Sequence, residues 1–565
     1  MGLPEVRLGI HPGFAGTVRL PPLVGDLAAL DMMLTGRMVS ARAARRLGLV
    51  DEIVPERHLL HAAEVFLKRG APRRQAPWYR RVPAWKPLRT LVVRWFTPRV
   101  RRKAHPDHYP APWRILELWR DRATEDQEAQ SLGELLVSRS SRNLVHVFLL
   151  GEELKRRGKA QVHGDVPGRT SAAGDMTSGA AIEHVHVIGA GIMGADIAIW
   201  AVHKGFRVSL QDQRPEILAR AMKKAHGFFK SKLKEPRAVQ EAMDRFMPDL
   251  EGHGLKRADL VIEAIVEKVE PKRELFRMVE QKVRPQTLLA TNTSSIPLEE
   301  IGAVLKDPSR LVGLHFFNPV AQMQLVEIVR GAQSSEESLA RARAFTGAIE
   351  RLPLDVKSSP GFPVNRILMP YLIEAVKLVE EGVSVVTIDQ AATEFGMPMG
   401  PIELADSVGL DICLSVAEEL SEPLHMEVPD KLRELVRQGQ LGRKSGQGFY
   451  RYNARGRRES PPPDKTAADI PITERLILRL LNEAMACLRE GVVGDADAVD
   501  AGMVYGTGFA PFLGGPMSYI DSLGVTGISH SLHRLSQEYG PRFKPDAGWS
   551  QPELLMRRHR SSNQP

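Results

Sequence analysis

A histidine and a glutamate are the side chains in this sequence best suited to move a proton. His315 and Glu327 lie 12 residues apart, in HFFNPV and LVEIV, which we expect to be neighbouring extended segments. A neutral imidazole can take the proton of an alcohol near neutral pH. A carboxylate on its second nitrogen would fix the tautomer and stabilise the imidazolium that forms. The same spacing also suits an ordinary structural pair, so the surrounding sequence has to distinguish the two.

A glycine-rich turn upstream of this pair predicts a dinucleotide site. Gly189, Gly191 and Gly194 stand in G-x-G-x-x-G spacing between a short apolar strand, 186–188, and a helix that ends near residue 204. Such glycines allow a tight turn, let the backbone approach a pyrophosphate and let the helix pack closely on the strand. The free N–H groups at the helix N-terminus attract the phosphates. A glycine-rich turn in another kind of parallel sheet is the plainer alternative.

An acidic residue after the second strand bears on the choice of cofactor. Asp212 lies 23 residues after Gly189, about where a carboxylate holds the ribose hydroxyls of adenosine. It would repel the 2′-phosphate of NADP and so favours NAD, although Arg214 close by leaves NADP open. The cofactor contacts expected at this turn are Gly189, Gly191, Ile192, Met193, Gly194 and Asp212.

The later strands bring further polar residues to one edge of the predicted sheet. After a helical stretch at 215–247, apolar segments end at Glu267, at Ser294 and at His315. In an open parallel sheet, ligands bind beyond the carboxyl ends of the strands. We therefore expect a Rossmann-type domain whose cofactor lies beside these side chains.

These motifs resemble those of the L-3-hydroxyacyl-CoA dehydrogenases. The resemblance covers residues 184–456 and rests on GAGIMG, TNTSS, HFFNPV and FPVNR. It implies NAD-dependent oxidation of a 3-hydroxyacyl-CoA, with His315 as the general base and Glu327 as its partner. The further catalytic or substrate contacts that it implies are Ser294 and Asn365. The further cofactor contacts that it implies are Glu267, Lys272, Ser294 and Asn318.

An internal repeat divides the C-terminal part into two copies. NRILMPYLIEAVKLVEEGV from Asn365 aligns without a gap to ERLILRLLNEAMACLREGV from Glu474, and GPIELADSVG at 400–409 pairs with GPMSYIDSLG at 515–524. Because Asn365 becomes Glu474, we expect the first copy to close over the substrate. The second copy is expected to be structural and to replace a helical interface that shorter relatives form by dimerising. Tyr505 matches a family tyrosine that contacts substrate, and a core aromatic residue is an equal alternative.

The first 70 residues resemble part of a different enzyme. LPEV and PGFAGT are similar to motifs in the C-terminal half of the enoyl-CoA hydratases, and Glu5 matches one of that family's two catalytic glutamates. Hydration also needs a second carboxylate and an oxyanion hole, which belong to the half that is absent here. We therefore expect no hydratase activity from this chain, with Glu5 as a vestige and a start inside a longer gene as one cause.

Residues 69–103 carry a strong positive charge. This stretch holds 12 Lys and Arg residues and no acid, against a net charge of +9 for the whole chain, and includes Trp78, Trp85 and Trp95. Basic residues among aromatics suit nucleic acid or a membrane surface, but we favour a basic connector that packs on a neighbouring domain or faces an anionic ligand. Five prolines argue against a long helix there. Residues 163–181, rich in Gly, Ser and Ala, are typical of a flexible linker.

Length and composition restrict the remaining classes. A chain of 565 residues is expected to form three or four domains, and it has no run near the ~18 apolar residues that a membrane span needs. The N-terminus lacks the layout of a signal peptide. Cys413 and Cys487 are the only cysteines, which argues against a disulfide framework or a cysteine metal site and fits a cytoplasmic protein.

The combined prediction is an α/β plus α protein that resembles, over nearly its whole length, the multifunctional α subunits of fatty acid oxidation complexes. The predicted parts are a partial hydratase fragment, 1–70; a basic and helical connector, 71–183; a Rossmann-type NAD domain, 184–360; and two helical dehydrogenase domains, 361–456 and 472–565. The expected ligands are NAD and an acyl-CoA, without a metal ion or nucleic acid. A thiolase β subunit and a membrane surface are candidate partners. The alternatives are a non-catalytic NAD or acyl-CoA binding protein and a basic scaffold.

Overall fold

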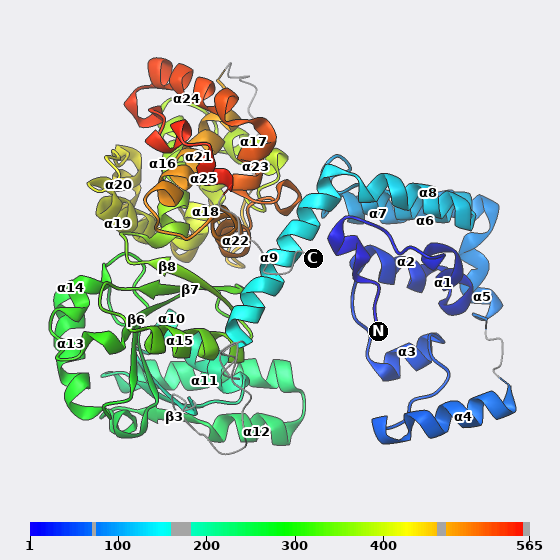
Figure 1. Cartoon of the computed structure of the whole chain (residues 1–565), viewed down its shortest axis with the longest axis horizontal. Coiled ribbons are helices and arrows are strands. Elements are labelled where there is room, and N and C mark those ends of the chain that lie inside the picture. Colours follow the sequence, from blue (N-terminus) through cyan, green and yellow to red (C-terminus); the bar gives the residue numbers. More distant parts are fainter. Residues whose placement is uncertain (71–74, 160–181, 460–469, 557–565) are drawn as a thin grey trace. The chain divides into compact units, whose positions relative to one another are not determined.

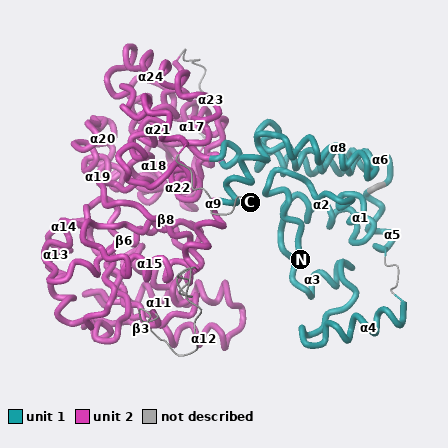
Figure 2. Tube along the Cα trace, viewed as in Figure 1, with its two compact units in different colours: residues 1–149, 511–514 teal, residues 150–510, 515–565 magenta. Residues whose placement is uncertain are grey.

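The chain divides into two compact units. The computed structural model describes residues 1–70, 75–159, 182–459 and 470–556. One unit comprises residues 1–149 and 511–514, and the other comprises residues 150–510 and 515–565 (Figure 2). The linker predicted at 163–181 lies outside the described residues. Within the described ranges, no helix is both long enough and apolar enough to cross a membrane.

The larger unit contains an eight-stranded sheet (Figure 1). The strands lie in the order β3-β2-β1-β4-β5-β6-β7-β8, and only the β6 and β7 neighbours are antiparallel. Their bounds are β1 (His184–Ile188), β2 (Arg207–Gln211), β3 (Phe246–Asp249), β4 (Leu260–Glu263), β5 (Leu288–Thr291), β6 (Leu311–Phe316), β7 (Leu325–Arg330) and β8 (Leu352–Lys357). The order of the first six is that of a doubly wound dinucleotide-binding fold, which confirms the predicted Rossmann-type domain.

Helices cover both faces of this sheet. Leu288 and Ala290 of β5 belong to one core with helices α10, α11, α12 and α15, whereas Leu289 belongs to a second core with α13 and α14. Burial on both faces explains why the strands are apolar throughout. These helices are α10 (Ile192–His203), α11 (Pro215–Leu233), α12 (Pro236–Asp244), α13 (Val269–Lys282), α14 (Leu298–Gly302) and α15 (Glu336–Ala348). Two of them, α11 and α12, form the helical stretch predicted after Asp212.

The two predicted helical copies follow the sheet. Copy 1 consists of α16 (Phe362–Glu380), α17 (Val385–Phe395), α18 (Pro401–Val408), α19 (Leu410–Ser421) and α20 (Asp430–Arg437). Copy 2 consists of α21 (Ile472–Arg489), α22 (Ala496–Thr507), α23 (Pro516–Leu523), α24 (Val525–Tyr539) and α25 (Glu553–Met556). The first helices of the copies, α16 and α21, pack against each other.

Ion pairs cross the contact between α16 and α21 in a two-fold pattern. Arg366 lies 2.7 Å from Glu483 and 2.7 Å from Glu490. The repeat relates residues 109 positions apart, so Arg475 is the equivalent of Arg366. Arg475 pairs with Glu374 and Glu381, which are the equivalents of Glu483 and Glu490. Each copy thus presents the same surface to the other, as the subunits of a symmetric dimer do.

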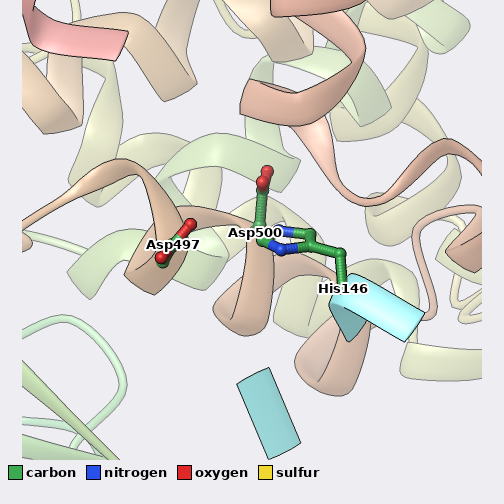
Figure 3. Close-up of side chains that lie close together, drawn as sticks. All are labelled: His146, Asp497 and Asp500. Carbon is green, nitrogen blue, oxygen red and sulfur yellow. The ribbon is translucent and has the colours of Figure 1, made fainter. Parts of the chain in front are cut away.

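An aspartate anchors the third helix of each copy. Asp389 of α17 accepts hydrogen bonds from two N–H groups at the start of α18. Asp500, which Figure 3 shows beside Asp497 on α22, accepts from two N–H groups at the start of α23. A Cβ at Gly400 or Gly515 would overlap the facing aspartate. This close approach explains why GP begins the third helix in both copies.

The smaller unit contains helices and loops and, among its described residues, no strand. Its helices are α1 (Gly16–Val24), α2 (Asp26–Thr35), α3 (Ala41–Leu47), α4 (Leu59–Arg69), α5 (Trp78–Arg81), α6 (Lys86–Arg101), α7 (Pro110–Asp121) and α8 (Glu125–Leu136), and α9 (Arg139–Lys159) leads into the larger unit. Residues of α1, α2, α6 and α7 share one apolar core, which includes Leu30, Phe96 and Trp119. The hydratase-like segment and part of the basic stretch therefore pack together.

The prediction that prolines exclude a long helix from the basic stretch is wrong. α6 runs for 16 residues. Pro87 occupies its first turn, where the missing N–H would have no helical partner, and Pro98 falls in its last turn. Phe96 and Val100 are buried against the core, so tertiary packing stabilises a helix that a count of prolines disfavours.

Candidate active site

Each glycine of the turn between β1 and α10 has the geometry expected for it. Gly189 has a φ of +100°, a conformation that glycine adopts without strain. A Cβ at Gly194 would overlap the carbonyl oxygen of Gly189, so the helix approaches the strand only with glycine there. A Cβ at Gly191 would meet no atom within 4 Å. The backbone at Gly191 is therefore open on this side, next to the first turn of α10, which begins with Ile192 and Met193, and a helix N-terminus of this kind is a general site for phosphate groups.

Asp212 supports this turn from the end of β2. Its Oδ2 accepts a hydrogen bond of 3.0 Å from the N–H of Ala190, and its Oδ1 accepts one of 3.0 Å from the N–H of Arg214. The carboxylate is thus fixed one residue past the strand, where a ribose hydroxyl is expected. The guanidinium of Arg214 lies 3.9 Å from the same carboxylate. Arg214 therefore pairs with Asp212. This arrangement suits a dinucleotide whose ribose carries a free 2′-hydroxyl, as in NAD.

His315 of β6 and Glu327 of β7 are direct partners in the antiparallel pairing. The Nδ1 atom of His315 lies 2.6 Å from Oε2 of Glu327, and both side chains are buried. Because the carboxylate accepts the proton on Nδ1, the neutral ring keeps its lone pair on Nε2. The rings of Phe317 and Phe362 pack beside the imidazole. This geometry provides a base held in a single tautomer.

The second oxygen of Glu327 reaches copy 1 of the helical repeat. Oε1 accepts a hydrogen bond of 3.0 Å from the N–H of Val364, in the first turn of α16. The partial positive charge at a helix N-terminus stabilises a carboxylate. Asn365, the next residue, is half-buried in the same turn. Glu327 therefore connects His315 to the turn that carries Asn365.

Glu267 organises the loop after β5. Its Oε1 accepts hydrogen bonds from the N–H of Ser294 at 2.6 Å and from the hydroxyl of Thr293 at 2.5 Å. Burial favours protonation of Glu267, but the charge of Lys272 and these hydrogen bonds outweigh it and hold the pKa of Glu267 below its ordinary value. A charged Glu267 thus fixes the backbone around Ser294.

Two residues behind this loop, the buried Glu263 and the half-buried Asn292, were not expected from the sequence. Glu263 lies 2.7 Å from Lys272, whose side chain is fully buried, and 2.7 Å from the hydroxyl of Thr291. Asn292 accepts a hydrogen bond of 2.9 Å from the N–H of Phe316, next to the histidine. Glu263 ends the apolar segment LVIE, and Asn292 lies in the TNTSS motif. An acid or amide directly at a strand end is the signal that could have found them. Lys272 bridges Glu263 and Glu267 inside the domain.

The remaining predicted residues lie in separate settings. Asn318 is exposed just beyond β6, three residues after His315. Tyr505 lies on α22 with its hydroxyl against the backbone of Gly151 in α9, and burial raises its pKa to about 12. Glu5 belongs to the smaller unit, in the short helix η1 (Pro4–Leu8), and one of its carboxylate oxygens is buried with no hydrogen-bond partner among the described residues.

Comparison with known families divides the chain in a similar way. The family "3-hydroxyacyl-CoA dehydrogenase, NAD binding domain" matches residues 184–359. The family "3-hydroxyacyl-CoA dehydrogenase, C-terminal domain" matches residues 361–452 and again 472–559. The enoyl-CoA hydratase/isomerase family matches residues 1–73. The larger unit therefore contains the NAD-binding domain of a dehydrogenase and two copies of its C-terminal domain.

Individual relatives support the same assignment. A fatty acid oxidation complex subunit alpha from Shewanella loihica is 35% identical over 572 residues, which covers 96% of this chain and 79% of that protein. The solved structure of 3-hydroxybutyryl-CoA dehydrogenase from Escherichia coli K12 is similar with a TM-score of 0.60 and 29% identity, covering 67% of this chain and 99% of that one. The dehydrogenase part of multifunctional enzyme 1 from C. elegans is similar with a TM-score of 0.50 and 26% identity, covering 72% and 98%. The chain belongs to the family of fatty acid oxidation complex α subunits, and through it to the 3-hydroxyacyl-CoA dehydrogenases.

Proposed function

We propose that His315 is the base with which this NAD-dependent dehydrogenase oxidises an L-3-hydroxyacyl-CoA to the 3-ketoacyl-CoA in fatty acid oxidation. The buried 2.6 Å contact between Nδ1 of His315 and Glu327 carries the assignment of the base. The substrate class follows from the matched dehydrogenase domains and from the relatives, one of which is a 3-hydroxybutyryl-CoA dehydrogenase.

The reaction requires that a proton and a hydride leave the alcohol together. The hydroxyl proton passes to Nε2 of His315, the hydrogen on C3 leaves with its electron pair, and the C–O bond becomes a carbonyl. NAD⁺, when bound, supplies the acceptor for that hydride. Glu327 stabilises the imidazolium that forms, because its carboxylate already holds Nδ1.

The other predicted residues position substrate and cofactor in this proposal. Asn365 lies one residue after the N–H that binds Glu327, so a substrate contact there would be held in register with the base. Ser294 is fixed through Glu267 and is expected to contact both ligands. The turn from Gly189 to Gly194, with Asp212, would hold the pyrophosphate and ribose, and Asn318 would lie beside the nicotinamide. Glu267 and Lys272 are assigned to shaping this region.

Replacing the histidine tests the proposal. We expect His315→Ala to lower turnover by on the order of a hundredfold or more, measured as NADH formed from L-3-hydroxybutyryl-CoA, while NAD binding stays near the wild-type value. His253, an exposed histidine of the same domain, provides the matched control, and His253→Ala should retain full activity. Near-normal turnover of His315→Ala would contradict the assignment. The absence of NADH formation by the wild-type chain would favour the alternative, a non-catalytic NAD or acyl-CoA binding protein.

We infer that the hydratase-like segment does not make this 565-residue polypeptide a hydratase. The segment supplies Glu5, whereas the chemistry needs two carboxylates and an oxyanion hole. Incubation with crotonyl-CoA should give no 3-hydroxybutyryl-CoA. Hydration by the purified polypeptide, lost in Glu5→Gln, would overturn this inference.

We also infer a thiolase as the protein partner. The support is the name of the relative, which is a subunit of a fatty acid oxidation complex, together with the 3-ketoacyl-CoA product, which a thiolase consumes. Co-purification of this chain with a co-expressed thiolase subunit tests the inference, and independent elution of the two would contradict it.

A further inference from the structure

The helices α5 and α6 and the short helix η3 (Val82–Ala84) between them carry basic but no acidic side chains, and together they are here called the basic aromatic face. Residues 69–103 contain no acid. Arg89 is buried, where it donates to the carbonyl of Arg120, but most of the other described cations project into solvent. The exposed ones include Arg81, Lys86, Arg94, Arg99 and Arg102. No role in the dehydrogenase chemistry uses this charge.

The same face exposes large aromatic side chains. The exposed fractions are 77% for Trp78, 62% for Trp85 and 54% for Trp95. The guanidinium of Arg99 lies 3.3 Å from the centre of the Trp95 ring, in a cation–π contact. Exposing three tryptophans on one short segment costs free energy in water, and exposed apolar surface of this kind marks interaction sites when it is contiguous. Tryptophan and arginine together are typical of the interface between a bilayer and water.

An apolar groove lies within this face. Its volume is about 310 Å³ and nearly all of its lining is apolar. The lining includes Leu27 of α2, Val82 and Pro83 of η3, and Leu88, Leu91 and Trp95 of α6. The groove therefore offers a site for hydrocarbon directly beside the exposed cations.

We propose that the basic aromatic face binds the surface of an anionic lipid bilayer. A bilayer satisfies all three features at once, because head groups neutralise the cations, the interface accommodates the tryptophans, and an acyl chain or the bilayer edge fills the groove. Nucleic acid would match the charge but would leave the groove unused. An acidic protein partner would have to be acidic over the whole contact. Residues 69–103 contain no acid that could pair with a cation of the partner and so fix its position. The contact is peripheral, with the chain lying on the membrane.

Vesicle flotation with the full 565-residue chain tests the proposal. We expect the chain to float with vesicles of phosphatidylcholine that contain phosphatidylglycerol, and not with phosphatidylcholine alone. Added salt should weaken the binding because it screens the charges. Binding to neutral vesicles equally well, or to neither kind, would overturn the proposal. Binding to a short DNA duplex without binding to vesicles would assign the face to nucleic acid and would also overturn it.

Two sets of variants locate the binding surface. The combined change Arg81→Gln, Lys86→Gln and Arg94→Gln should weaken partition into anionic vesicles by on the order of a hundredfold. The combined change Trp85→Ser and Leu91→Ser should weaken it while leaving the charge intact. The matched control removes three exposed arginines from α3, Arg42→Gln, Arg45→Gln and Arg46→Gln, and should retain most of the binding. Equal loss in the control would show that net charge alone drives partition and would overturn the assignment to this face.

Dehydrogenase activity provides the check on folding. The basic aromatic face lies in the smaller unit and the active site in the larger unit, so every variant should form NADH at the wild-type rate in the absence of lipid. The proposal does not depend on the assignment of His315, because vesicle binding and NADH formation are measured independently.

Discussion

The two copies of the helical bundle share their buried charges and differ where copy 1 meets the sheet. In both, an arginine of the first helix pairs with two glutamates of the other copy, and an aspartate anchors the third helix. Only α16 of copy 1 donates a backbone hydrogen bond to Glu327. At the aligned end of α21, Glu474 pairs with Arg534 of copy 2 itself. The contacts by which the copies hold each other are therefore the same in both, whereas the first turn of the first helix differs between them.

The largest predicted effect comes from breaking the symmetric charge pairs. Arg475 and Glu374 are both fully buried, so Arg475→Met leaves a buried carboxylate with less compensation. We expect a loss of about 3 kcal/mol in the free energy of unfolding, at the lower end of the range for breaking a buried ion pair. The loss is limited because Arg542 also pairs with Glu374. Urea unfolding measures it.

The equivalent change in copy 1 separates stability from activity. Arg366→Met removes the same type of pair, but Arg366 follows Asn365 directly, so this variant should also lower kcat/KM. The activity of folded Arg475→Met should match wild type. Equal kinetic defects in both variants would show instead that the two copies contribute equally to the active site.

The two aspartate anchors have different hydroxyl partners. Asp389 is buried and accepts a hydrogen bond of 2.8 Å from the hydroxyl of Tyr450, in the segment that closes copy 1. Asp500 accepts one of 2.7 Å from the hydroxyl of Ser518, on the anchored helix itself. Burial raises the pKa of Asp389 to about 6, from an ordinary 3.8, although the hydrogen bonds oppose the shift. Because the native state holds this proton more tightly than the unfolded chain, the stabilisation is present below about pH 4 and is lost as the pH rises to about 6.

A substitution that cannot titrate reveals this dependence. The free energy of unfolding of Asp389→Asn should improve relative to wild type by ~2 kcal/mol between pH 4 and pH 6, on top of a constant offset from the altered hydrogen bonds. Tyr450→Phe removes one bond to the carboxylate, so it should move the wild-type transition to higher pH. A difference between Asp389→Asn and wild type that is independent of pH would show that the carboxyl does not titrate in this range.

The parts of the site that depend on local sequence could be predicted, and the parts that depend on packing could not. The glycine turn is a local backbone requirement, and His315 and Glu327 face each other because two short strands pair directly. By contrast, the role of Glu263 depends on Lys272 reaching it from α13, and the bond from Val364 to Glu327 joins two domains. No spacing rule contains such contacts. The same limit explains the missed helix α6, since its stability comes from Phe96 and Val100 packing on other helices.

The smallest predicted effect tests the functional difference between the copies most directly. Asn365 and Glu474 occupy the same position of the repeat, but only Asn365 directly follows the residue that donates to Glu327. Asn365→Ala should lower kcat/KM by about tenfold, the value of one hydrogen bond to the substrate, with little change in NAD binding. Glu474→Ala should leave kcat/KM unchanged, because its partner Arg534 lies in copy 2. If both variants lost activity alike, the second copy would also contribute to the reaction. The difference between Asn365 and Glu474 could then not be explained by position 474 having no role in the reaction.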